Sequence, residues 1–522
     1  MAGARQVRPR DPVAARRWGI GWLLLSALAL SGCGSLPSLE SRTPSHALTD
    51  TASAPLGKAV AAEVALHPGL SGIEAFTDGR VAFALRIALA RAATRSIDIQ
   101  TFIWHADATG MLLYEEMLRA AERGVRVRLL LDDVNAEGLD PIFALLDTHP
   151  NIELRLYNPF VSRGSRGLGF LGDFARLNRR MHNKSFTVDN QVTIVGGRNI
   201  ANEYFEAGED QSFADIDVMA VGAAVPAVST EFDTYWNSAS AYPARLIIKR
   251  DPAIGREEFA QRTQQLIAGD AQKYLEAVNR TPQAQALLAG TLQLEWTTVR
   301  VVHDDPEKTL SGSEKTTVQL LPRLLVAFGS PTKEFDLVSP YFVPGELGTE
   351  ALVSLAKRGV RVQVLTNSLA ANDETSVHSG YARRRKALLR AGVELYEIKS
   401  AAATIKARAA EIDKHSKAGL HAKTFAVDRR SIFVGSFNFD PRSAKLNTEM
   451  GLVIDSVPLA ERLSKMFDTA SPALAYRVTL GADDALQWHD GAGATLNDEP
   501  DSSWGQRMKV RVFSWLPIEW LL

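Results

Sequence analysis

Two stretches of the chain alternate hydrophobic and polar residues in the same way. Residues 182–199 read HNKSFTVDNQVTIVGGRN, and residues 421–438 read HAKTFAVDRRSIFVGSFN. A period of two is typical of a strand with one face toward the core, so each stretch predicts a strand, a turn and a second strand. Because residues i and i+2 of a strand share a face, the His and the Lys that open each stretch point the same way.

The pattern around these stretches also occurs twice, at a nearly constant distance along the chain. In each copy a strand-like run, a helical segment, an RGVRV sequence opening a second strand, and a third strand follow one another. Strands alternating with helices predict duplicated α/β sandwich domains, each with a mostly parallel central sheet flanked by helices. The paired segments are 96–103 and 335–342, 123–127 and 358–362, and 153–157 and 394–398.

Changes in composition divide the 522 residues into five parts. A length of this size favours more than one core. A Ser-, Pro- and Thr-rich stretch without a period predicts a flexible tether. The last residues combine Trp, Leu, Lys and Arg, which suits either a membrane-interfacial segment or packing on the protein itself. The predicted parts are 1–33, a lipoprotein signal; 34–62, the tether; 63–290 and 291–480, the two domains; and 481–522, the tail.

The N-terminus has the pattern of a targeting segment. Five arginines precede an apolar run from Gly19 to Leu30, which is too short for a confident membrane span. The run ends in Leu-Ser-Gly-Cys33, which resembles a bacterial lipobox, and Cys33 is the only cysteine. We therefore expect a lipid anchor at Cys33 in the cell envelope, facing the periplasm, with a plain signal peptide or a buried thiol as alternatives. Gly34 in place of Asp favours the outer over the inner membrane.

Polar residues recur at matched positions in the two stretches. Asp189 and Asp428 follow the first strand at a turn signal, so each is either a catalytic residue or a structural turn residue. The matched sets are His182, Lys184, Asp189, Gly196 and Asn199, and His421, Lys423, Asp428, Gly435 and Asn438.

The paired H-x-K-x4-D motifs, each followed by G-[GS]-x-N, resemble the phospholipase D superfamily. In that superfamily two such motifs build one active site between two domains related by a pseudo-two-fold axis. Further segments resemble the branch that contains bacterial cardiolipin synthases of the C type. These segments are 180–184 (RMHNK), 202–205 (NEYF), 366–369 (TNSL), and 447–449 (NTE).

A phosphodiester is an anion, so its site must supply positive charge and hydrogen-bond donors. Lys184 and Lys423 supply the charge. We expect neither a metal nor a cofactor, because no His/Cys/Asp cluster has the spacing of a ligand set. The expected phosphate-binding residues are Gly196, Asn199, Gly435, Ser436 and Asn438.

Two histidines suit a two-step displacement in which one forms a phosphohistidine and the other transfers protons. The resemblance implies His182 as nucleophile and His421 as general acid and base. A carboxylate is expected to orient each imidazole. Glu449 matches the family's residue. Aligning DIDVMA with EMGLVI gives Asp215 as its counterpart, with Asp217 as a rival, and surface or turn placement stays open for all three.

The resemblance implies a phosphatidyltransferase that makes cardiolipin from phosphatidylglycerol and a second phospholipid, with phosphatidylethanolamine as one possible donor. A phospholipase D hydrolase releasing phosphatidic acid, a nuclease and an inactive envelope scaffold are the alternatives. A net charge of −1 and the lack of a basic aromatic stripe argue against a nucleic-acid partner. We expect a phospholipid membrane as partner, and the sequence leaves an auxiliary protein open.

Overall fold

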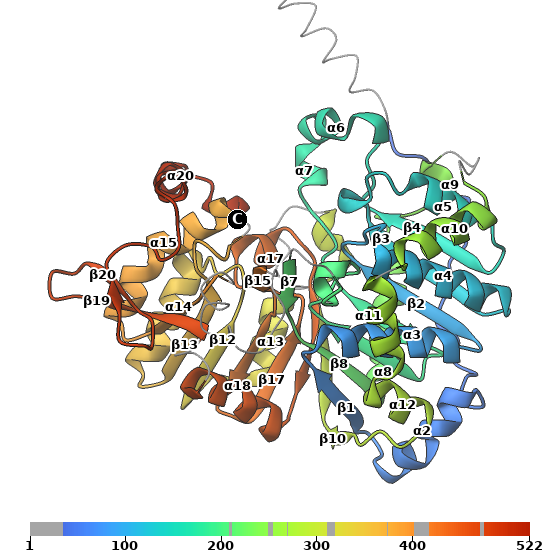
Figure 1. The fold of residues 1–522 in the computed structure, drawn as a ribbon, viewed down its shortest axis with the longest axis horizontal. Helices are drawn as coiled ribbons and strands as arrows, with labels where there is room; N and C mark the ends of the chain where they lie inside the picture. The colour runs from blue at the N-terminus through green and yellow to red at the C-terminus, as the bar shows by residue number, and fades with distance from the viewer. Residues whose placement is uncertain are drawn as a thin grey trace, which may run out of the picture.

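The computed structural model describes residues 35–207, 211–248, 254–268, 270–310, 319–372, 374–400, 417–469 and 474–522. Within them the chain forms two large sheets flanked by helices and lying side by side (Figure 1). The first sheet takes its strands from the chain up to Thr297, and the second begins at Val299. The chain therefore changes sheets at Thr298, near the predicted boundary after residue 290.

The first sheet has nine strands in the order β10-β1-β8-β6-β5-β2-β3-β4-β9. One continuous core joins its inner face to α3 (Gly79–Ala92), α4 (Ala108–Glu122), α5 (Asp140–Asp147) and α10 to α12 (Arg256–Leu266, Asp270–Asn279, Pro282–Leu288). The strands are β1 (Ser71–Phe76), β2 (Ser96–Thr101), β3 (Arg126–Asp132), β4 (Ile152–Tyr157), β5 (Ser185–Val188), β6 (Val192–Gly196), β8 (Asp217–Gly222), β9 (Ala241–Pro243) and β10 (Glu295–Thr297).

The second sheet has ten strands in the order β11-β18-β17-β16-β12-β13-β14-β19-β20-β21. Helices α14 (Gly345–Lys357) and α15 (Thr375–Arg390) cover it, and α20 (Trp504–Trp515) lies against α15. The predicted tail from residue 481 thus adds strands and a helix to the second domain. The strands are β11 (Val299–His303), β12 (Glu334–Val338), β13 (Arg361–Asn367), β14 (Glu394–Ile398), β16 (Thr424–Val427), β17 (Ser431–Gly435), β18 (Met450–Ile454), β19 (Ala475–Leu480), β20 (Leu486–His489) and β21 (Thr495–Leu496).

The structure confirms the α/β class and the duplication, and it corrects the predicted strand direction. Among the described strands of the two large sheets, only β2-β3-β4 and β12-β13-β14 pair in parallel, because strand–helix–strand units join them. The other pairs in both sheets are antiparallel, including the two motif hairpins β5-β6 and β16-β17. Each sheet is therefore mixed rather than mostly parallel.

A third core cluster holds the two halves together. It joins β6 and β8 of the first sheet to β16, β17 and β18 of the second, and includes Val195, Val218, Val434 and Leu452. In addition, β7 (Gln211–Ala214) pairs in parallel with β15 (Lys417–Leu420) across the joint. The remaining elements are α6 (Arg166–Gly172), α7 (Phe174–Leu177), α8 (Ala224–Trp236), α9 (Ala244–Ile247), α13 (Leu320–Phe328), α17 (Pro441–Lys445), α18 (Val457–Thr469), and the short η1 (Asp133–Asn135), η2 (Arg163–Ser165), η3 (Asn202–Tyr204), η4 (Pro306–Thr309) and η6 (Glu519–Leu521).

The predicted tether over 34–62 is not free chain where it is described. The Arg42 guanidinium donates to the Asn237 carbonyl oxygen at 2.7 Å, and Arg155 donates to the Thr43 carbonyl oxygen at 2.8 Å. Helix α2 (Pro55–Leu66) then follows. The predicted signal segment lies outside the described residues. Among the described helices, none combines the length and the apolar character needed to cross a membrane.

Candidate active site

Each motif histidine forms a backbone hydrogen bond with the other half of the molecule. The His182 amide donates to the Thr448 carbonyl oxygen at 2.9 Å, and the His421 amide donates to the Ala214 carbonyl oxygen, also at 2.9 Å. In both cases the accepting residue stands just before an acidic residue. The two hydrogen bonds repeat one arrangement, and they bring both histidines to the joint between the sheets.

The acidic residues that follow the two acceptors contact the imidazoles. His182 Nδ1 lies 2.8 Å from Glu449 Oε2, and His421 Nδ1 lies 2.6 Å from Asp215 Oδ2. All four side chains are buried. Each acid contacts the histidine of the opposite half, so neither half contains a complete pair. The two motifs therefore form one shared site.

The two pairs differ in what surrounds the carboxylate. The Ser436 hydroxyl donates to Glu449 Oε2, and the Glu449 amide donates to Asp304 Oδ2 at 2.9 Å. Gly197 stands at the position matching Ser436, and a Cβ there would lie 2.2 Å from Asp215 Oδ1. The longer Glu thus has a serine to hold it, while the shorter Asp lies directly against the backbone.

Three predicted acids lie away from the imidazoles. The rival Asp217 forms a buried ion pair with Arg86 at 2.9 Å. Asp189 accepts hydrogen bonds from the amides of residues 94–96, and Asp428 from those of residues 332–334. Both have positive φ, at 51° and 53°, in the hairpin turns at the far ends of their strands. Their catalytic assignment is thus corrected: these carboxylates fasten the turns.

The motif glycines allow close strand packing. A Cβ on Gly196 would lie 2.0 Å from Asp217 Oδ1, and one on Gly435 would lie 2.3 Å from the Met450 carbonyl oxygen. The Gly435 amide also donates to the Lys423 carbonyl oxygen at 3.3 Å. Because the neighbouring strand approaches so closely, no side chain fits at either position.

The expected amide and hydroxyl donors are engaged to different degrees. Asn199 accepts from the Ile103 amide at 3.2 Å and donates to the Tyr204 hydroxyl at 2.9 Å. Ser436 is committed to Glu449. Asn438 differs, because its buried Oδ1 has no hydrogen-bond partner among the described residues. Of the expected phosphate-binding residues, Asn438 alone keeps a polar atom unused within the described part of the chain.

Both lysines are buried beside the histidines, and each donates to the carbonyl oxygen of the histidine two residues before it. Burial and the charges of Lys184 and Lys423 lower the pKa of His182 well below its usual value. Burial and the charge of Lys423 lower the pKa of His421 to about 4. Burial also lowers the pKa of Lys184 to about 7. Both imidazoles are therefore neutral in the empty site at neutral pH.

The two carboxylates differ in protonation. Burial raises the pKa of Asp215, but the charge and hydrogen bond of His421 more than offset this and hold it at about 2. Burial raises the pKa of Glu449 to about 7, because Lys184 and Ser436 offset only part of the effect. At neutral pH Asp215 is ionised, whereas Glu449 is near its midpoint.

Aromatic rings enclose the imidazoles. Phe102 lies edge-on to His182 with ring centroids 4.9 Å apart. Tyr204 and Phe213 lie 5.0 and 5.2 Å from His421. The contacts of Phe102 and Phe213 were not predicted from the sequence. Phe102 belongs to the repeated segment 96–103, which was the available signal, whereas nothing in the pattern marked Phe213.

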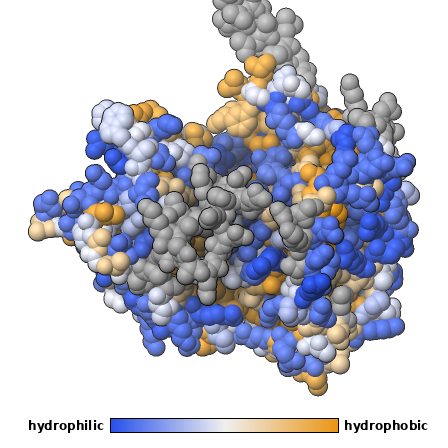
Figure 2. Space-filling model, in the orientation of Figure 1, coloured by the Kyte–Doolittle hydropathy of each residue, from blue (hydrophilic) through white to orange (hydrophobic). Residues whose placement is uncertain are grey.

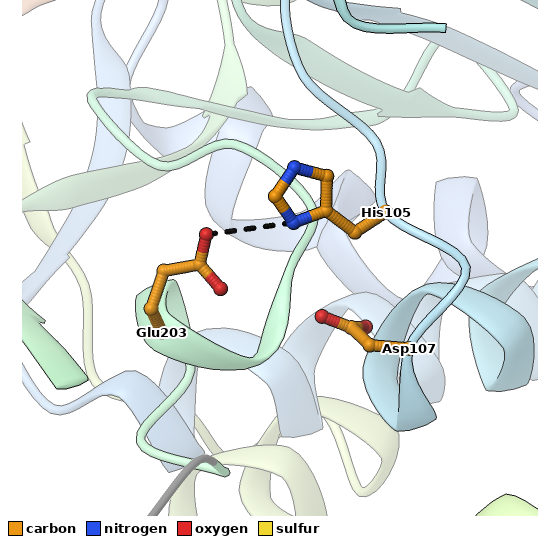
Figure 3. A group of neighbouring side chains, drawn as sticks. All are labelled: His105, Asp107 and Glu203. Carbon is orange, nitrogen blue, oxygen red and sulfur yellow. Dashed lines mark ion pairs between the residues drawn. The ribbon is translucent and has the colours of Figure 1, made fainter. Parts of the chain in front are cut away.

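Among the described residues, one group brings possible metal ligands within 4.8 Å of one another, namely His105, Asp107 and Glu203 (Figure 3). Both oxygens of Asp107 already accept hydrogen bonds, from the Gly110 amide at 3.0 Å and the Asn202 amide at 2.7 Å. Asp107 thus caps α4, and His105 forms a 3.6 Å ion pair with Glu203. We assign no metal to this group.

Comparison with known proteins agrees with the geometry. The family described as cardiolipin synthase, PLD-like domain, matches residues 86–236 and 324–470, and each range contains one motif histidine and one of the two acids that contact an imidazole. The chain belongs to this family. It therefore lies in the phospholipase D superfamily, as its paired motifs predicted.

Two similar proteins match most of the length of the chain. Cardiolipin synthase C of Escherichia coli K12 is 46% identical over 477 residues, which cover 90% of this chain and 99% of that protein. An uncharacterized Helicobacter pylori 26695 protein is 31% identical over 453 residues, covering 84% and 87%. A phosphatidylserine synthase of Haemophilus influenzae Rd KW20 shares the fold, with a TM-score of 0.57 at 14% identity over 89% of this chain and 100% of that one.

Proposed function

We propose that this protein makes cardiolipin by moving a phosphatidyl group to phosphatidylglycerol through a phosphohistidine at His182. As a member of the cardiolipin synthase family it is a phosphatidyltransferase. The observation that carries the mechanism is the crossed pair of His–carboxylate contacts. Two oriented imidazoles beside two buried lysines suit a two-step displacement at a phosphodiester.

In the first step His182 Nε2 attacks phosphorus, since Nδ1 is held by Glu449. The bond from phosphorus to the headgroup oxygen breaks, and His421 gives that oxygen its proton. Burial and the charge of Lys423 keep His421 neutral before substrate binds. The substrate's negative charge between Lys184 and Lys423 offsets the lysine charges, so that His421 takes up a proton. Ionised Asp215 then stabilises the imidazolium. This difference between the acids favours His421 as the proton carrier and His182 as the nucleophile.

In the second step a headgroup hydroxyl of phosphatidylglycerol attacks the phosphatidyl-His182 phosphorus. His421 takes the hydroxyl proton, the phosphorus–nitrogen bond breaks, and cardiolipin leaves. Water in place of that hydroxyl would give phosphatidic acid. The aromatic rings of Phe102, Tyr204 and Phe213 beside the histidines support lipid transfer over hydrolysis, because they limit access of water.

The products identify the reaction. The protein is given vesicles of phosphatidylglycerol and phosphatidylethanolamine, and the products are measured by mass spectrometry. We expect cardiolipin, with free ethanolamine if phosphatidylethanolamine is the donor and free glycerol if phosphatidylglycerol is. Phosphatidic acid as the sole product would reject the proposal and identify a hydrolase.

We also propose an envelope location with a lipid on Cys33, supported by the lipobox-like sequence. Cys33 lies outside the described residues. Metabolic labelling with a fatty acid tests this: label on the wild-type protein and none on Cys33→Ala is expected. Equal labelling, or none on either, contradicts the proposal. Fractionation of the envelope tests the preference for the outer membrane.

A further inference from the structure

Helix α20 has an exposed apolar stripe that the fold does not use. Trp504, Met508, Val512 and Trp515 follow at helical spacing on one face, whereas Val510 on the opposite face is buried. The exposed fraction is 69% for Trp504 and 90% for Trp515. Exposed Trp side chains along one face of a helix are typical of helices that lie in a membrane interface.

The charges of α20 fit an anionic surface. The helix carries Arg507, Lys509 and Arg511 and no acidic residue. On a helical projection, Lys509 lies on one side of the apolar stripe and the two arginines lie on the other. A helix with Trp on one face and basic residues along its edges matches an anionic bilayer surface in both apolar and electrostatic respects.

A second apolar projection is formed by α6 and α7, here called the lip, residues 166–177. Leu168 and Leu171 are 59% and 73% exposed. The base of the lip is fixed, because Arg163 forms ion pairs with Asp133 and Asp140. The lip and α20 both stand at the upper edge of the molecule in Figure 1, and Figure 2 shows hydrophobic residues gathered on the lip.

One arginine joins both projections to the active site. Arg442, just after the second motif, donates to Asn178 Oδ1 at 2.6 Å and to the Asn178 carbonyl oxygen at 3.1 Å. Asn178 caps α7 directly after the lip and stands four residues before His182. The Arg442 side chain also donates to the carbonyl oxygen of Leu521, in the segment that follows α20, at 3.0 Å. Arg442 thus forms hydrogen bonds both with the residue that follows the lip and with the segment that follows α20.

We infer that the α20 stripe and the lip together dock on the surface of a bilayer containing anionic phospholipid, so that lipids enter the site from the membrane without crossing water. The inference rests on the proposed function, which requires substrates that reside in a bilayer. The first described segment of the chain, drawn in blue, begins near α6 in Figure 1, so an anchor at Cys33 would hold this edge toward the membrane.

Spin labels on the full chain test the docking directly. Labels are placed on Trp515→Cys, Leu171→Cys and, as control, Leu66→Cys. Leu66 is 71% exposed and ends α2, which lies at the lower edge of the molecule in Figure 1. In vesicles of phosphatidylglycerol and phosphatidylethanolamine, we expect the first two labels to gain access to oxygen and lose access to a water-soluble nickel complex. Labels that stay in water, or a Leu66 label that behaves the same way, would overturn the inference. Wild-type protein treated in parallel reports any label on Cys33.

Turnover gives a second readout that does not depend on a new cysteine. We expect Trp504→Ser combined with Trp515→Ser to lower cardiolipin formation on vesicles about tenfold and to leave the rate on monomeric short-chain phosphatidylglycerol unchanged. An equal loss on both substrates would indicate a structural role and overturn the inference.

Two further outcomes distinguish membrane docking from the proposed function and from a contact between two copies of the chain. Label depth does not depend on catalysis, so labels that insert without any cardiolipin being formed would support the docking and reject only the proposed function. Spin–spin coupling between Trp515→Cys labels in solution, without vesicles, would identify the stripe as a contact between two copies and overturn the inference.

Discussion

At the scale of single residues, the two orienting acids hold equivalent positions with different charge. Asp215 has a pKa of about 2, and Glu449 has a pKa of about 7. Burial raises the pKa of both carboxyls, but the charge and hydrogen bond of His421 more than offset this at Asp215, whereas Lys184 and Ser436 offset only part of it at Glu449. The pH dependence of the enzyme should therefore distinguish the two histidines.

Replacing Glu449 with Gln should matter more as pH rises. At pH 6 most Glu449 is already protonated, so Gln resembles it, while at pH 8 the wild type is ionised and better stabilises positive charge on His182. We expect the wild-type to Glu449→Gln ratio of kcat to grow about tenfold between pH 6 and 8. The Asp215→Asn ratio should stay constant over this range, because Asp215 is ionised throughout. A Glu449→Gln ratio that does not change with pH would contradict the assignment.

Lys184 should set the basic side of the pH profile. Its pKa of about 7 means that the free site loses positive charge above that pH, which weakens binding of an anionic phosphodiester. We expect kcat/KM to fall above pH 7 in the wild type and to stay level in Lys184→Arg, because a guanidinium keeps its proton. Because Arg is larger than Lys and alters the absolute rate, the test compares only the shape of the kcat/KM profile against pH. The same fall in both proteins would assign it to another group.

The sequence predicted the histidines and lysines because spacing within a repeat reveals residues of matching chemistry. Glu449 was predicted from the family resemblance, and Asp215 from aligning the two halves. The sequence did not reveal which motif residues lie beside the imidazoles and which form hydrogen bonds with backbone amides in the turns. Asp189 and Ser436 both belong to the motifs, yet one fastens a turn and the other holds Glu449. Those contacts depend on segments 13 to more than 90 residues away.

At the scale of elements, the turn aspartates predict a change in stability without a change in chemistry. Asp428→Asn removes a charged acceptor of three amides, so we expect the free energy of unfolding to fall by about 1–3 kcal/mol. In the folded enzyme kcat and KM should not change. Denaturant unfolding and initial rates measure the two effects. A hundredfold loss of kcat with unaltered stability would return Asp428 to the catalytic residues.

Hydrophobic periodicity predicted the hairpins and the strand–helix–strand order. It could not predict strand direction across a sheet, because alternation reads the same in parallel and antiparallel strands. Antiparallel neighbours on both sides of each three-strand parallel unit therefore appeared only in the structure. The stretch before α2 was predicted to be a flexible tether, but Arg42 and Thr43 form hydrogen bonds with Asn237 and Arg155. Hydrophobic periodicity does not reveal such polar contacts.

At the scale of the whole molecule, the resemblance to the phospholipase D superfamily predicted one site between two halves, but the sequence did not show how the halves share it. Each acid orients the histidine of the other half, and a common core of β6, β8, β16, β17 and β18 holds this arrangement. A symmetric repeat does not distinguish pairing within a half from pairing across halves. The crossed pairing makes the two halves inseparable for activity.

The most direct test of this account is the specific activity of His182→Ala, His421→Ala and the double variant, measured as cardiolipin formed on mixed phospholipid vesicles. One shared site predicts that each single variant loses at least about a thousandfold and that the double variant is no worse, because the residues act as a unit. Single variants that each keep about half of the activity, with loss only in the double variant, would mean two independent sites and would contradict it.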